Sequence, residues 1–210
     1  VNDYGCDSLR MYELFVGPPE LDAEWDDRGI DGVNRFLKRL WNLLMDSKEA
    51  DVQPTKEMIK LRHKMVYDIT NRLESFSLNT VISGFMEYNN KFIEMAKKEG
   101  GIDKETLETI AVLLSPFAPH FAEEMWEQLG HGETIFKAGW PSYDESAMKD
   151  DEIEVPVQIN GKTRAVISIS ADASKDEAIA AGKEAVADKL TGTIVKEIYV
   201  PKKIINIVQK

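Results

Sequence analysis

The hydrophobic period of this chain changes near residue 150, and that change limits the folds open to it. Up to residue 130, apolar residues recur at the i, i+3, i+4, i+7 spacing of amphipathic helices. From residue 153 they alternate with polar residues, as in half-buried strands. We therefore predict an all-α antiparallel helical bundle followed by a small α+β domain with the order β-hairpin, helix, β-hairpin.

Six helices are expected in the first part. The first is short, with Asp7 or Ser8 as its cap and Gly17-Pro18-Pro19 as its end. The later helices begin before Val33, near Pro54-Thr55, near Leu78, after Asp103 and after Pro116, and the fourth ends at Gly100-Gly101. The second carries the clearest buried stripe, which consists of Val33, Phe36, Leu37, Leu40, Trp41 and Leu44.

Two prolines interrupt the stretch LLSPFAPHFAEEMWEQLG at residues 113–130. Pro116 cannot continue a helix, because its ring clashes with the preceding turn and it has no N–H group. Pro119 suits the first turn of the next helix, where the missing N–H group costs nothing. The pair predicts a fixed corner between two packed helices, with Phe117 and Phe121 directed into their shared core.

The final sixty residues contain clear strand and turn signals. Residues 153–159 alternate, and Pro156 favours an edge strand or the beginning of a strand. Asn160-Gly161 predicts a two-residue hairpin turn, followed by a second strand over 163–170. Ser174 and Glu177 predict a helix-capping box. Two further strands are expected on either side of a turn at residues 201–203.

Charge separates the same two parts. The chain has a net charge of −11. Residues 1–150 hold 17 basic and 28 acidic side chains, whereas residues 151–210 hold nine of each. An acidic total does not exclude RNA binding, because affinity follows the potential of one surface. The polar stretch DESAMKDDE, residues 144–152, is the expected hinge.

Several classes of protein are disfavoured. No apolar run approaches the roughly 20 residues of a membrane span. The N-terminus does not have the pattern of a signal peptide, and it begins at Val1 rather than at methionine, which suggests a piece of a longer protein. The lone Cys6 excludes an internal disulfide framework and a zinc site built on cysteines, and we expect it to be a small buried thiol.

No side-chain pattern predicts a complete active site. His63, His120 and His131 lack metal-ligand spacing. Glu123 and Glu124 fit the favourable potential at the start of a helix better than an acid–base role. The sequence has no glycine-rich phosphate loop after a strand and no nucleophile elbow. By its residues, this chain is not a self-sufficient enzyme, and a hydrolase that uses Glu123 and His120 is a remote alternative.

Three groups of cations are candidate RNA contacts. Lys162 and Arg164 flank the expected hairpin tip, and Lys202 and Lys203 occupy the second turn, so the two turns could form one phosphate-contact surface. A basic face on the second helix carries Arg35, Lys38 and Arg39. In each case the alternative is a solvated charged surface, which turns beside edge strands also use to resist aggregation.

Several stretches resemble a known family in sequence and order. YGCDSLRMYELFVGPPELDAEW resembles the segment after the Lys-Met-Ser-Lys-Ser loop of class I aminoacyl-tRNA synthetases, and GIDGVNRFLKRLWNLL and LLSPFAPHFAEEMWEQLG resemble their helical bundle. GWPSYDES resembles the exit from that bundle. VPVQINGKTRAVISI and KEIYVPKKIINIV resemble the small C-terminal domain of bacterial leucyl-tRNA synthetases. Isoleucyl enzymes typically end in a cysteine-bound zinc module and valyl enzymes in a coiled coil, and neither pattern is found here.

The resemblance implies a C-terminal fragment of a leucyl-tRNA synthetase. Residues 1–25 would link it to the catalytic core, 26–144 would form the anticodon-binding-type helical domain, 145–152 the linker, and 153–210 a small tRNA-binding domain. Arg35, Lys38, Arg39, Lys162, Arg164, Lys202 and Lys203 would contact tRNA-Leu at its elbow and backbone.

The same resemblance implies that catalysis lies outside the fragment. The fragment would hold no catalytic, cofactor or metal site, and ATP with magnesium would serve the upstream catalytic domain, with which it would pack. The intact enzyme would be a cytoplasmic monomer that binds neither membrane nor DNA. The alternative from another class is an acidic helical module that binds proteins and not RNA.

Overall fold

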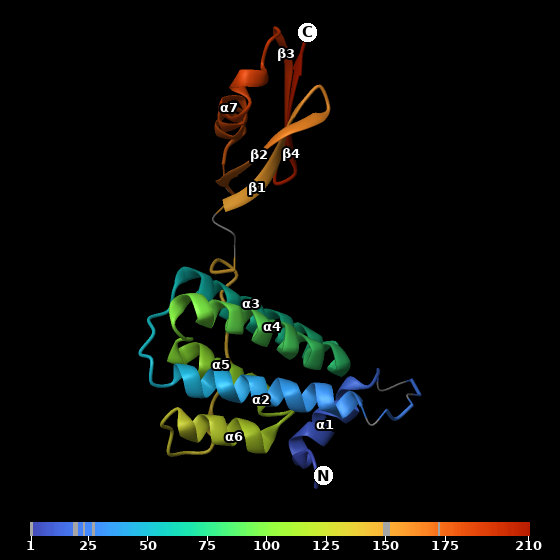
Figure 1. Cartoon of the computed structure of the whole chain (residues 1–210), viewed down its shortest axis with the longest axis vertical. Coiled ribbons are helices and arrows are strands. Elements are labelled where there is room, and N and C mark those ends of the chain that lie inside the picture. Colours follow the sequence, from blue (N-terminus) through green and yellow to red (C-terminus); the bar gives the residue numbers. More distant parts are fainter. Residues whose placement is uncertain (1, 19–20, 23, 27, 149–151, 172) are drawn as a thin grey trace. The chain divides into compact units, whose positions relative to one another are not determined.

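The computed structural model describes the whole chain except residues 1, 19–20, 23, 27, 149–151 and 172. It divides into two compact units, one within residues 1–148 and one within residues 149–210 (Figure 1). We call them the helical unit and the small unit. Three residues of the expected linker, and Pro19 of the expected first helix end, lie outside the described residues.

The described residues of the helical unit form six α-helices. They are α1 Gly5–Phe15, α2 Gly29–Ser47, α3 Lys56–Glu74, α4 Leu78–Glu99, α5 Lys104–Leu114 and α6 Pro119–Gln128. A short 3-10 helix, η1, follows at Ile135–Lys137. Helix α3 packs against α4, α1 against α2 and α5 against α6, and α2 and α4 also lie against each other, so the expected helical bundle is confirmed (Figure 1). The buried faces meet in one apolar core that includes the stripe expected on α2.

Several helix ends follow the local chemistry expected from the sequence. The Thr55 and Asp103 side chains accept hydrogen bonds from the third backbone N–H groups of α3 and α5. Gly100 ends α4 with φ of +82°, a left-handed conformation that favours glycine. Pro119 is the first residue of α6, as the proline corner requires. Phe117 at that corner is 3% exposed, and Phe121 packs against the same core.

The first helix begins earlier than expected. Neither Asp7 nor Ser8 caps α1, because the helix already starts at Gly5. Both residues lie within its first two turns, and both are buried. The Asp7 carboxylate instead accepts a hydrogen bond from the backbone N–H of Phe121, 2.7 Å away, in the first turn of α6. A residue of α1 therefore fulfils the capping role for a helix that starts more than a hundred residues later.

The small unit is a four-stranded sheet with one α-helix on one face (Figure 1). Its elements are β1 Glu152–Ile159, β2 Lys162–Ser170, α7 Lys175–Ala185, η2 Ala187–Lys189, β3 Ile194–Val200 and β4 Ile204–Gln209. Asn160 and Gly161 have φ of +51° and +79°, which fits the two-residue turn expected between β1 and β2. Ser174 and Glu177 form the expected capping box at α7. A core that includes Val157, Ile205 and Ile207 lies between α7 and the sheet.

Pro156 lies neither on an edge strand nor at the beginning of a strand, so both parts of the sequence-based expectation are wrong. The strand order is β2-β1-β4-β3, so β1 is internal, antiparallel to β2 and parallel to β4. The paired residues of β1 and β4 start with Val157 and Ile205, one position beyond the proline. Pro156 has no N–H to donate, but it lies outside that pairing, so an internal strand can accommodate it.

Candidate nucleic-acid interface

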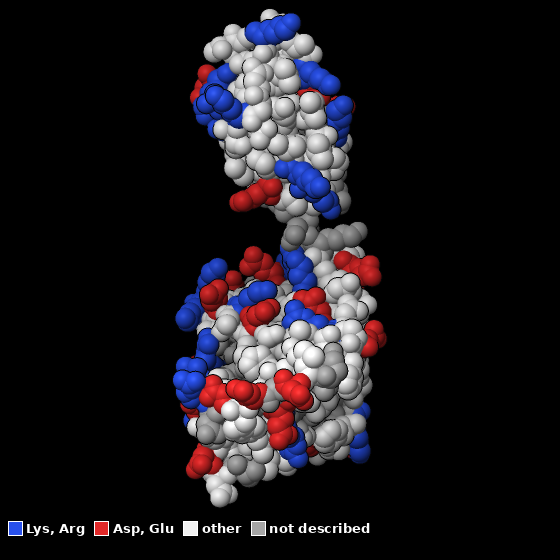
Figure 2. Space-filling model, turned by 90° about the vertical axis from the view of Figure 1, so that its right-hand side faces the viewer, with Lys and Arg blue, Asp and Glu red and all other residues white. Residues whose placement is uncertain are grey.

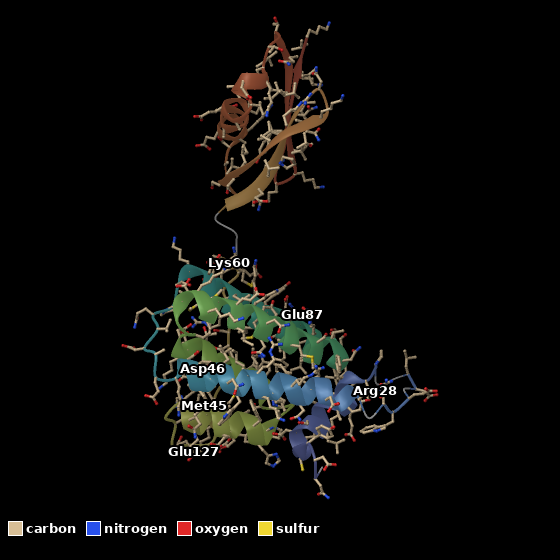
Figure 3. The ribbon with its side chains drawn as sticks, in the orientation of Figure 1. Arg28, Met45, Asp46, Lys60, Glu87 and Glu127 are labelled. Atoms are coloured by element: carbon tan, nitrogen blue, oxygen red, sulfur yellow. The ribbon has the colours of Figure 1, made fainter. Side chains whose placement is uncertain are left out.

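The basic face of α2 lies on the surface of the helical unit. Arg35, Lys38 and Arg39 are all exposed, and their spacing places them within one turn of the helix. Arg28, labelled at the start of α2 in Figure 3, differs from these three cations, because its guanidinium already forms an ion pair with Asp26 at 3.1 Å. Hydrogen bonds from Arg28 hold the pKa of the Asp26 carboxyl below its usual value. We call Arg35, Lys38 and Arg39 the α2 ridge.

A groove of about 700 Å³ lies beside the α2 ridge. Residues from α1, α2 and α6 line it, including Lys38, Trp41, Phe121 and the exposed Cys6. The expectation that Cys6 is buried is wrong, because it occupies the outer side of the first turn of α1 while Asp7 and Ser8 face inward. The groove is mostly apolar, and its polar lining residues come from α1, α2 and α6.

The three histidines have structural partners in different places. His120 Nδ1 lies 2.9 Å from the Asp7 carboxylate, which also accepts a hydrogen bond from Arg10. His131 Nε2 lies 2.7 Å from the Glu108 carboxylate, and its ring stacks on Trp126. The His63 ring accepts a hydrogen bond from the backbone N–H of Asp144. Each contact stabilises the packing of the helical unit.

His120 and Glu123, the pair considered for a hydrolase, have different hydrogen-bond partners in the structure. While His120 contacts Asp7, the Glu123 carboxylate accepts hydrogen bonds from the Thr134 hydroxyl and the Ile135 backbone N–H. Glu123 thus holds the start of η1 against α6.

The part of the chain that the structure describes contains no group of three or more His, Cys, Asp or Glu side chains that could hold a metal ion. Among the same residues, no helix has the length and hydropathy to cross a membrane.

The two cationic turns of the small unit lie at opposite ends of its sheet. Because β4 runs parallel to β1, the β1–β2 turn lies beside the end of β4, and the β3–β4 turn lies beside the beginning of β1 (Figure 1). Strand β4 has six residues, or about 20 Å at 3.3 Å per residue. Lys162 and Arg164 therefore lie about one strand length from Lys202 and Lys203, too far for the two pairs to contact the same phosphate.

Strand pairing brings further cations to the β1–β2 turn. Lys189 donates a hydrogen bond to the backbone carbonyl of Arg164. Lys196 lies beside Val208 in the β3–β4 pair, and Lys210 pairs its backbone with Thr193. Local sequence patterns do not predict these three positions, because Lys189 reaches β2 from η2, and β3 and β4 reach the β1–β2 turn only through the pairing of β4 with β1. On the face of the small unit in Figure 2, lysine and arginine predominate, whereas both signs are interspersed on the helical unit.

Comparison with known proteins identifies the family to which this chain belongs. A family model described as the anticodon-binding domain of tRNA ligase matches residues 55–179, more than half of the chain. The chain therefore belongs to the family of tRNA-ligase anticodon-binding domains.

The individual relatives are more specific. The chain is 44% identical to the leucine–tRNA ligase of Fervidobacterium nodosum, over 100% of this chain and 28% of that protein. It is 41% identical to the leucine–tRNA ligase of Phocaeicola vulgatus, over 99% of this chain and 22% of that protein. The resemblance inferred from the motifs is thus confirmed. The chain spans about a quarter of the length of these curated relatives.

A solved structure agrees with this assignment. The agnB2 LeuRS of Agrobacterium radiobacter K84, determined as a ternary complex with tRNA and LeuAMS, matches 100% of this chain and 30% of its own. The TM-score is 0.78 and the sequence identity 25%. A helical domain followed by a small α+β portion is therefore an architecture that this chain shares with a leucyl-tRNA synthetase.

Proposed function

We propose that this chain is a tRNA-binding part of a leucine–tRNA ligase and that it positions tRNA-Leu for a catalytic domain elsewhere in a longer protein. In this proposal residues 26–144 are the anticodon-binding-type domain, 145–152 the linker, 153–210 a second tRNA-binding domain and 1–25 the link to the catalytic core. The aminoacylation itself, with its ATP and magnesium, takes place in that core. The intact protein is proposed to work as a monomer in the cytoplasm.

The observation that carries this proposal is the family match over residues 55–179, supported by identities above 40% to leucine–tRNA ligases over essentially the whole chain. A domain without a catalytic constellation of its own can still accelerate a reaction. If it holds one reactant in place, a bimolecular encounter becomes effectively intramolecular, and that conversion is worth up to about 7–11 kcal/mol.

The α2 ridge supplies the type of contact that such positioning needs. Three exposed cations within one helical turn can pair with successive phosphates of an RNA backbone without reading its sequence. Lys162 and Arg164 offer a second contact on the small unit, and Lys202 with Lys203 a separate third. Because these contacts release counterions, they should weaken steeply as salt rises.

The first test is a titration of the chain with a tRNA-Leu transcript over a series of salt concentrations. Arg35, Lys38 and Arg39 are changed together to alanine, and in a second variant Lys162 and Arg164 are changed to alanine. Each lost phosphate contact should reduce the slope of log K against log salt by about one. The matched control changes Lys98, Lys104 and Lys137 to alanine, since these exposed lysines lie outside the proposed contacts.

Two outcomes of this titration would contradict the proposed RNA contacts or the proposed function. If the α2-ridge variant keeps the slope and affinity of the unchanged chain, Arg35, Lys38 and Arg39 are not RNA contacts. If the unchanged chain binds no tRNA at any salt but retains protein partners, the acidic protein-binding module is the better description.

A further inference from the structure

One end of the small unit is built from three segments that are far apart in the sequence. The β1–β2 turn, the loop after η2 and the last residues of β4 meet there. The backbone of Asn160 donates to the Ile207 carbonyl, and Thr193 and Lys210 exchange two backbone hydrogen bonds. We call this end the tip; the opposite end, where β1 begins and β3 turns into β4, is the base.

Side-chain hydrogen bonds fix the tip. The side-chain amide of Asn160 donates a hydrogen bond to the Gln209 backbone carbonyl and accepts one from the Gln209 backbone N–H, as a paired strand residue would. Asn206 accepts a hydrogen bond from the Gly161 N–H. Gln209 reaches the other way, accepting from the Gly192 N–H and donating to the Lys189 carbonyl. The backbone that carries the tip cations is therefore held in one arrangement before any ligand binds.

The tip gathers more positive than negative charge. Five exposed cations belong to it, and the described acidic side chains at this end that are not paired with a lysine are Glu184 and Asp188. Glu197 lies nearby on β3, but its carboxylate is paired with Lys183. The five cations are Lys162, Arg164, Lys189, Lys196 and Lys210.

The base has a different balance. Lys202 and Lys203 project from the β3–β4 turn and Lys175 begins α7, but three exposed acids among the described residues lie at the same end of the sheet. Glu154 lies near the start of β1, and Asp176 and Glu177 are in the first turn of α7. Although the small unit as a whole is close to neutral, its charge is distributed unevenly along the strands. An RNA phosphate feels the local potential and not the net charge.

We propose that the tip is the principal RNA-phosphate site of the small unit, with Lys189, Lys196 and Lys210 acting alongside Lys162 and Arg164. This inference rests on the proposed tRNA-binding function and specifies where the small unit contacts the RNA. Cations on a fixed backbone lose less conformational freedom on binding than cations on a mobile loop, so pre-organisation adds to the charge effect. The tip also lies a full strand length from residue 152, at the end of the unit farthest from where the chain enters it.

The test compares charge reversals of equal size in the full 210-residue chain. Lys162→Glu with Lys196→Glu changes the tip, and Lys202→Glu with Lys203→Glu changes the base. The single reversal Lys175→Glu, in the first turn of α7, is compared with Lys196→Glu alone as a matched control. Binding of a tRNA-Leu transcript is measured at about 0.1 M salt, and amide chemical shifts are followed during the titration of the unchanged chain.

We expect the RNA affinity of the tip double variant to be at least about tenfold lower than that of the unchanged chain. Each phosphate contact contributes nearly one power of the salt concentration to the binding constant, and this variant is expected to lose two such contacts. The base double variant should lose clearly less, and Lys175→Glu less than about twofold. The amides of Gly161, Lys189 and Lys196 should shift on RNA addition, and those of Lys202 and Lys203 should shift less. Retained Gly161 and Gln209 resonances confirm that each variant is folded.

Three results would overturn the inference. The base variant could lose as much affinity as the tip variant, or the tip variant could lose less than twofold although the unchanged chain binds. If instead the unchanged chain binds no RNA, the proposed function fails and this site fails with it. Should the double reversal unfold the small unit, Lys162→Gln with Lys196→Gln replaces it, with an expected loss of at least about threefold.

Discussion

The contact between Asp7 and the first turn of α6 shows how one side chain can join distant parts of the bundle. Its carboxylate receives hydrogen bonds from the Phe121 N–H and the Arg10 guanidinium and lies beside His120 Nδ1. Ala118 and Pro119, at the start of α6, supply no side-chain acceptor for that helix. Asp7 therefore fills a capping position that the local sequence leaves empty.

Replacing Asp7 with alanine should destabilise the helical unit by about 1–3 kcal/mol, because the Phe121 N–H and the side chains around it lose their acceptor. Urea unfolding followed by tryptophan fluorescence measures this effect selectively, since all four tryptophans lie within residues 1–148. Glu127→Ala, which removes an exposed carboxylate from α6 (labelled in Figure 3), should change the free energy of unfolding by less than about 0.5 kcal/mol. Equal effects of the two variants would contradict the assigned role.

At the level of elements, local sequence signals predicted helix ends and turns, but they did not predict the pairing of distant strands. The ends of α3, α4 and α5, the Asn160-Gly161 turn and the capping box of α7 depend on residues within four positions of each other, so the sequence contains the necessary information. The strand order and the cap from Asp7 depend on contacts between distant segments. The internal position of β1, the division of the cations between two ends of the sheet and the positions of Lys189, Lys196 and Lys210 were therefore not predictable from local patterns.

The capping box of α7 gives a pH-dependent prediction. Hydrogen bonds from the Ser174 backbone and hydroxyl lower the pKa of Glu177 below its usual value of 4.5. Because the folded pKa is depressed, the stabilisation is present above pH 4.5 and is lost as the pH falls through the folded pKa. Glu177→Gln should therefore lower the stability of the small unit at pH 6 but have a smaller effect at pH 3. Hydrogen exchange at Ala178 and Ile179 measures this difference, and an equal effect at both pH values would contradict it.

At the scale of the whole molecule, each unit has a hydrophobic core of its own. The large core belongs to α1–α6 and the small one to α7 and the sheet. We predict that Leu113→Ala, a truncation at a fully buried position of α5, lowers the stability of the helical unit by about 2–5 kcal/mol. Tryptophan fluorescence should report that loss, while hydrogen exchange in β1 and β4 stays unchanged. Faster exchange in those strands would show that the two units unfold together.

The parallel pairing of β1 with β4 also determines how the small unit can assemble. Val157 and Ile205 are neighbours in the sheet but lie 48 residues apart in the sequence. The two hairpins and α7 can form early, yet the central ladder requires closure of a long loop before it gains any hydrogen bond. Helix pairs such as α3 and α4 meet through a three-residue connection and have no comparable delay. On dilution from denaturant, tryptophan fluorescence should recover before exchange protection appears in β1 and β4, so the small unit would become native after the helical unit.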